Sequence, residues 1–115
     1  MEFDRLTIVL FLANPDAATL DEAAENEIQD AHMDHLARMH EAGVLLAAGP
    51  VVGASTRQVR GLCIDAVDPN RARELHESDP AVRTGRLTIQ TSTWMVPTGA
   101  VSFSRTRFPH SQAEL

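Results

Sequence analysis

The sequence predicts an α+β fold whose elements follow the order β-α-β-β-α-β, with an antiparallel sheet. Residues 6–12 form a nearly unbroken apolar run, too short for a stable helix and rich in strand formers. A long helical pattern follows and is stopped by Gly43. Two more strand patterns then precede Asp68-Pro69, a strong start signal for a second helix.

The first strand, residues 6–12, is expected to be buried on both faces and therefore needs cover on each side. Asn14-Pro15 breaks it, and a helix is expected from about Leu20 to Ala42. The acidic residues at the start of this helix suit the positive end of the helix dipole. We interpret the rest of the acidic stretch as a solvated helix face.

The second half of the chain repeats the same alternation. The expected elements are a strand at 44–48, a loop at 51–58, a strand at 59–66, a helix from 69 to near 78, a short turn at 80–85 and a strand at 86–96. Both βαβ halves fit a ferredoxin-like arrangement with two helices on one sheet face. Residues 1–97 would form this domain, and residues 98–115 a tail that is mobile unless it docks on a partner.

One sheet face is left without a helix, and the apolar first strand makes such a face costly to expose. A second copy of the chain is the simplest cover, so we expect a homodimer that pairs its sheets face to face. A chain of 115 residues also has little surplus stability of its own.

The composition excludes several classes of protein. A net charge of −6 argues against a nucleic-acid partner. No apolar run approaches the ~18 residues that span a membrane, and the N-terminus lacks a basic signal-peptide start. The single cysteine, Cys63, cannot form an internal disulfide, which fits a reducing compartment. We therefore expect a cytoplasmic protein.

His35 is the most unusual residue in the helical pattern, because it falls within the apolar stripe that includes Ile28 and Met39. An imidazole there must either donate to a backbone carbonyl or open onto a cavity. With an unperturbed pKa near ~6.5, it is also a natural proton carrier. The stripe alone does not choose between a structural and a catalytic histidine.

Three stretches together resemble the YCII (YciI-like) family: His35-Leu36-Ala37-Arg38-Met39, the segment 43–50 ending in Ala-Gly-Pro, and the segment 78–85 with its Asp79-Pro80. The resemblance implies a ferredoxin-like fold that pairs as a dimeric α/β barrel. It also implies an active site built from the helix histidine and the Asp-Pro aspartate, here His35 and Asp79. Links of this family to chlorinated aromatics suggest a phenolic substrate.

Asp79 could equally be a helix N-cap, and the two roles are compatible because a carboxylate has two oxygens. His32, Ser92 and Trp94 are candidate pocket-lining residues, and Trp94 could instead lie at a dimer interface. His32 and His35 have a spacing that can bind metal, but no third ligand is identified, so no metal is expected.

The predicted function is general acid–base chemistry by His35 and Asp79 on a small organic molecule: elimination, isomerisation or proton transfer, with no cofactor. The alternative is a non-catalytic dimeric module that binds a small ligand or serves as a scaffold. A third possibility, a small monooxygenase, rests on fold analogy alone.

Overall fold

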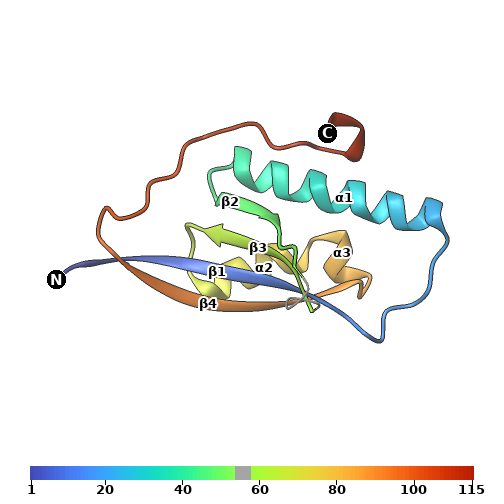
Figure 1. Ribbon diagram of the computed structural model, residues 1–115, viewed down its shortest axis with the longest axis horizontal. Coiled ribbons are helices and arrows are strands. Elements are labelled where there is room, and N and C mark those ends of the chain that lie inside the picture. Colours follow the sequence, from blue (N-terminus) through green and yellow to red (C-terminus); the bar gives the residue numbers. More distant parts are fainter. Residues whose placement is uncertain (54–57) are drawn as a thin grey trace.

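The computed structural model describes residues 1–53 and 58–115. Its elements are β1 (Phe3–Ala13), α1 (Glu22–Glu41), β2 (Leu45–Pro50), β3 (Val59–Asp65), α2 (Pro69–Glu77), α3 (Pro80–Arg83), β4 (Leu87–Pro97) and the short 3₁₀ helix η1 (Gln112–Glu114) (Figure 1). The α+β class and the order of the elements are confirmed. The loop expected at 51–58 includes residues 54–57, which lie outside the described residues.

The four strands form one antiparallel sheet in the order β2-β3-β1-β4, the ferredoxin-like arrangement. β1 is central, and Phe11 lies between Gly61 of β3 and Ile89 of β4. β1 is longer than its apolar run because all of its eleven residues, polar ends included, pair with β4. Backbone pairing therefore extends beyond the part of the strand that hydrophobicity marks.

An aspartate begins each α-helix. The side chains of Asp21, Asp68 and Asp79 accept hydrogen bonds from the backbone N–H of Ala24, Arg71 and Ala81, at 2.8, 2.9 and 2.9 Å. Because Asp21 is the cap, α1 begins one residue later, at Glu22, and not at Leu20. Gly43, with φ 80°, follows the end of α1 in the left-handed conformation that glycine adopts without strain.

The core lies between the sheet and the helices. Val9, Phe11, Leu45 and Cys63 project from the strands against Met39 of α1 and Ala72 of α2, and all six are buried. The helices therefore cover one face of the sheet, as the sequence predicts for this fold.

The opposite face of β1 carries Leu6, Ile8, Leu10 and Leu12, all half-buried, and none of the helices in the described part of the chain packs on it. Trp94 lies beside Leu6, and Ser92 beside Ile8, in the neighbouring strand. Both residues therefore belong to the helix-free face, where Trp94 is half-buried and Ser92 is exposed.

The C-terminal segment after β4, expected to be mobile on its own, packs on this chain's own α1. It leaves β4 and runs back beside α1, so that η1 lies over the N-terminal half of that helix (Figure 1). Polar side chains of α1 make many of these contacts, so part of the face interpreted as solvated is covered. Within the described residues, no helix is long and apolar enough to cross a membrane.

Gly61 is the position at which the sheet leaves room for the Phe11 ring. A Cβ at residue 61 would stand 3.3 Å from Phe11 Cδ2 and 3.4 Å from the Gly49 carbonyl oxygen. Gly61→Ala should therefore lower the free energy of unfolding by about 1–3 kcal/mol, the range for overpacking. A Cβ at Gly49 meets nothing within 4 Å, so Gly49→Ala is the matched control and should be neutral or slightly stabilising. Equal midpoints for the two variants in urea unfolding would contradict this account.

Candidate active site

The buried carboxylate of Asp79 meets the imidazole of His32. Asp79 Oδ2 lies 2.5 Å from His32 Nδ1, and Asp79 Oδ1 accepts the hydrogen bond from the N–H of Ala81. The Asp79 side chain is fully buried, whereas 13% of the His32 side chain is exposed. One carboxylate thus serves as helix cap and histidine partner together, which is the combined role that the sequence allowed.

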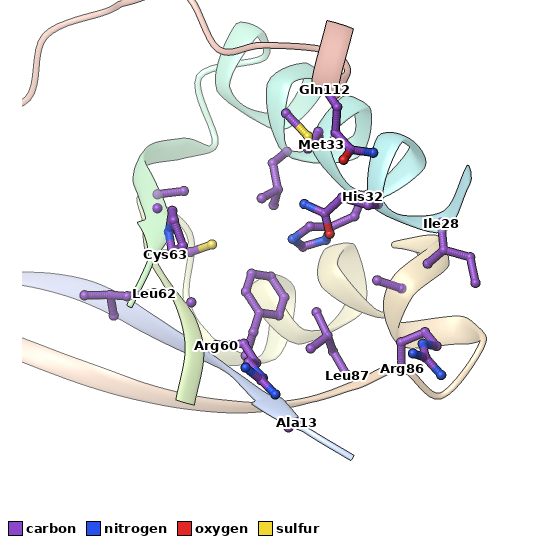
Figure 2. Close-up of a pocket in the computed structure, with 18 of the residues that line it drawn as sticks. Ala13, Ile28, His32, Met33, Arg60, Leu62, Cys63, Arg86, Leu87 and Gln112 are labelled. Carbon is purple, nitrogen blue, oxygen red and sulfur yellow. The ribbon is translucent and has the colours of Figure 1, made fainter. Parts of the chain in front are cut away.

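This contact fixes the chemistry of the His32 ring. A carboxylate oxygen accepts, so Nδ1–H of His32 donates to Asp79, and in the neutral ring Nε2 is left as the basic nitrogen. Among the described residues, none forms a hydrogen bond with that Nε2. The imidazole projects from α1 into a cleft (Figure 2). A basic nitrogen is therefore presented to whatever occupies the cleft.

His35, the histidine expected to pair with Asp79, lies elsewhere. Its Nε2–H donates to the carbonyl oxygen of Leu75 at 2.9 Å and so joins α1 to the end of α2. Asp79 contacts His32 and not the expected His35. The two histidines are three residues apart, so their side chains point about 60° apart around the helix, and only that of His32 faces Asp79. The pattern that could have found His32 is Ile28, His32 and Leu36, whose four-residue spacing lies along the cleft.

The cleft has a volume of about 850 Å³ and lies between α1, the β2–β3 edge and the C-terminal segment. This size is within the usual range for small-molecule sites. Phe11 and Cys63 line it from the sheet. His32 projects into it from α1 (Figure 2). Ser92 and Trp94 do not line it, because they project from the other face of the sheet.

Arg86 lies at one end of the cleft and is neutralised there. Its guanidinium donates to the carboxylate of Glu25 and to the carbonyl oxygen of Ala18. This contact joins two segments that are distant in the sequence, the start of α1 and the start of β4.

A second histidine–aspartate pair, which sequence reasoning missed, lies sealed in the core. His76 Nε2 is 2.7 Å from Asp65 Oδ2, and both side chains are fully buried. The Phe11 ring separates the two pairs: its centroid lies 5.1 Å from that of His32 and 5.5 Å from that of His76, edge-on to each. The sequence feature that could have indicated this pair is Asp65, which ends β3 three residues before the Asp68 cap.

Cys63 lies among these groups as an un-ionised thiol. Burial, followed by the nearby carboxylates of Asp65 and Asp79, raises the thiol pKa well above its ordinary value. It is thus a poor nucleophile and packs as a small apolar side chain. No group of three or more His, Cys, Asp or Glu side chains suited to a metal ion occurs in the described ranges.

The three sequence motifs at 35–39, 43–50 and 78–85 all lie within the range that one family model matches. A family model described as the YCII-related domain matches residues 7–91. The chain belongs to the YCII-related family. No curated protein sequence matches it.

The fold of this YCII-related chain also occurs in a solved enzyme structure. It is similar to 5-chloro-2-hydroxyhydroquinone dehydrochlorinase from Burkholderia phenoliruptrix AC1100, in complex with 2,5-dihydroxybenzoquinone, with a TM-score of 0.57. The sequence identity is 17%, and the match covers 77% of this chain and 92% of that one. At this identity the likeness shows a shared fold.

The sealed pair predicts an asymmetric mutational response. His76→Leu leaves the Asp65 carboxylate buried without its partner and should lower the free energy of unfolding by about 3–5 kcal/mol. The double variant Asp65→Val/His76→Leu removes both polar groups and should be clearly more stable than the single one. Denaturant unfolding of both variants measures this difference. A double variant at least as unstable as His76→Leu would show that the pair is not mutually dependent.

Proposed function

We propose that this YCII-related protein is an enzyme that moves protons on a small phenolic or quinone-type substrate, with His32 as general base and acid and Asp79 as its orienting carboxylate. The observation that carries the proposal is the 2.5 Å contact between His32 Nδ1 and the buried Asp79, which leaves Nε2 directed into the cleft. The sequence predicts His35 as the base, and the geometry favours His32 instead.

Burial explains why Asp79 suits this role. A carboxylate that accepts hydrogen bonds from His32 and from Ala81 N–H is held in one orientation and stabilises the imidazolium that forms when Nε2 takes a proton. His35 lacks this support, since its hydrogen-bond partner is a neutral carbonyl. Of the two helix histidines, His32 is the better placed to alternate between base and acid.

The substrate class is proposed from the lining of the cleft and from the related enzyme. Phe11, Met33 and Leu36 provide apolar contacts for an aromatic ring, while His32 provides a basic nitrogen at the same place. The solved structure of similar fold is a dehydrochlorinase with a dihydroxybenzoquinone bound. A ring that carries hydroxyl groups and a leaving group would fit this combination of apolar walls and one base.

Elimination from such a ring needs no oxidant. His32 Nε2 removes the proton of one hydroxyl and returns it to the ring carbon that bears the halogen, so that this oxygen becomes a carbonyl. A second hydroxyl then loses its proton to water while the carbon–halogen bond breaks and halide leaves with the bonding pair. The net change is loss of one hydrogen halide, and the product is a quinone.

The two helix histidines provide a matched test. With a chlorinated hydroxyhydroquinone as substrate, His32→Gln should lower kcat by about 10²–10⁴-fold, the usual contribution of a general base. Asp79→Asn should lower it as well, because the ring loses its orienting acceptor. His35→Gln can still donate to the Leu75 carbonyl and should keep near-normal kcat. Chloride release and quinone absorbance report turnover.

Full activity of His32→Gln, or equal losses in His32→Gln and His35→Gln, would contradict the assignment. Tight binding of the quinone by the wild-type protein with no turnover of any chlorinated hydroquinone would instead identify a non-catalytic ligand-binding module.

We also infer that two copies of the chain pair through their helix-free sheet faces. The support is the row of Leu6, Ile8, Leu10 and Leu12, which extends across the sheet to Leu62 and Trp94 without a covering helix. In this arrangement Trp94 and Ser92 contact the partner, and the His32 cleft stays accessible on the other side of the sheet.

Light scattering at micromolar concentration should therefore give twice the chain mass of 12.6 kDa. Leu10→Lys places a charge in the centre of the apolar face and should shift the protein toward the monomer. Glu74→Lys, on the exposed side of α2, is the control and should leave the mass unchanged. A monomeric wild-type protein would overturn this inference.

A further inference from the structure

The C-terminal segment from Arg105 to Glu114, here called the strap, is held along α1 by specific contacts. At its beginning, Arg105 donates to the Glu41 carbonyl oxygen at 2.9 Å, and Thr106 N–H donates to His40 Nε2 at 3.1 Å. The Phe108 ring then stacks on the His40 ring with centroids 4.1 Å apart and an interplanar angle of 11°. These contacts fix the strap at the C-terminal end of α1.

His110 holds the middle of the strap. Its Nδ1 is 2.6 Å from Asp34 Oδ1 and its Nε2 is 2.8 Å from Glu41 Oε1. Each ring nitrogen faces a carboxylate oxygen, and a carboxylate only accepts, so both contacts are hydrogen bonds when the ring is protonated. His110 therefore bridges two acidic side chains that lie about two turns apart on the same face of α1.

Gln112 fixes the end of the strap near the N-terminal half of α1. Its backbone N–H and its side-chain Nε2 both donate to Asp30 Oδ1, at 2.8 and 3.1 Å, and Nε2 also reaches the Asn26 carbonyl oxygen at 3.3 Å. The amide group is thus held by its nitrogen. Its oxygen, Oε1, has no hydrogen-bond partner among the described residues.

These attachments bring part of the strap to the cleft that contains His32. Phe108, Pro109 and Gln112 all line it. In Figure 2 the Gln112 side chain descends from the strap beside Met33, above the His32 ring, with its amide oxygen toward the cleft. Part of the cleft wall therefore comes from residues outside the range 7–91 that the family model matches.

We propose that the strap determines ligand specificity, with Gln112 Oε1 accepting a hydrogen bond from a ligand hydroxyl while His32 acts on the same ring and Phe108 contacts its edge. This inference rests on the proposed function and adds its specificity. It selects hydroxylated rings over those whose oxygens are alkylated, because an alkylated oxygen has no proton to donate.

The ring of His110 makes the attachment of the strap depend on pH. Hydrogen bonds to Asp34 and then to Glu41 raise the His110 pKa above its ordinary value, and the same contact with His110 lowers the Asp34 pKa. Arg38 pairs with Asp34, while Arg107 and Glu114 flank His110 within the strap. The contribution of His110 is fully present below about pH 6.5 and is lost as the pH rises through the raised His110 pKa. The contribution of Asp34 is lost as the pH falls through the lowered Asp34 pKa.

The specificity is tested by ligand binding, which does not require turnover. By calorimetry near pH 6 under argon, the wild-type protein should bind hydroquinone, whose phenolic hydroxyls keep their protons at this pH, more tightly than 1,4-dimethoxybenzene. Gln112→Leu, which keeps the length of the side chain but removes the acceptor, should reduce this preference by about three- to tenfold, the effect of one hydrogen bond. Glu74→Gln on α2 is the control and should leave the preference unchanged. An unchanged preference in Gln112→Leu would overturn the role of Gln112.

The attachment of the strap is tested without any ligand. The backbone amides of His110, Gln112 and Glu114, which are hydrogen-bonded in the strap, should be protected from hydrogen exchange in the wild-type protein and exposed in His110→Leu. The β1 amides should remain protected in both as a check on folding. The His110 pKa, measured by NMR, should lie above 6.5 and fall in the Asp34→Asn/Glu41→Gln variant.

The two tests separate failure of the strap from failure of the proposed function. Equal exchange of the His110, Gln112 and Glu114 amides in the wild-type protein and in His110→Leu would overturn the strap, even if His32 is catalytic. If the wild-type protein binds neither hydroquinone nor 1,4-dimethoxybenzene, the proposed substrate class is wrong and the selection assigned to Gln112 fails with it.

Discussion

The position of α1 over the sheet depends on the fully buried carboxylate of Asp79. An isolated charge at such a depth would cost several kcal/mol, so it persists only with its acceptors satisfied. One oxygen takes the Ala81 N–H and starts α3; the other takes His32 and holds α1 in place. The same contact sets the tautomer of His32. The Asp79 carboxylate therefore both stabilises the fold and orients the candidate catalytic histidine.

Phe11 gives two similar histidine–aspartate pairs different surroundings. Its ring packs edge-on against both His32 and His76, so it forms a partition between the cleft and the sealed core. His32 has an edge that a ligand can reach, while the His76 pair has none. The residue types are the same on both sides; access decides which pair can perform chemistry. Gly61 permits this arrangement because it leaves space for the ring.

Acidic side chains of α1 form specific hydrogen bonds and ion pairs. Asp30, Asp34 and Glu41 accept hydrogen bonds from the strap, and Glu25 pairs with Arg86 at the other end of the cleft. A net charge of −6 thus includes side chains that attach a wall of the candidate site, in addition to those that are only solvated. Charge pattern alone could not distinguish the two kinds, because the strap that binds these residues is about 80 positions away in the sequence.

Local patterns in the sequence by themselves determined the α+β class, the order of the elements and the caps at Asp68 and Asp79, because caps and strand runs depend on neighbours within a few residues. They also pointed to a histidine on α1 facing Asp79, through motifs shared with the YCII-related family. Only the tertiary structure decided that this histidine is His32. The side of α1 that faces the sheet is ambiguous by about 60° from the pattern of Ala31, His32, His35 and Leu36 alone. Packing of α1 against α2, α3 and the strap resolves this ambiguity.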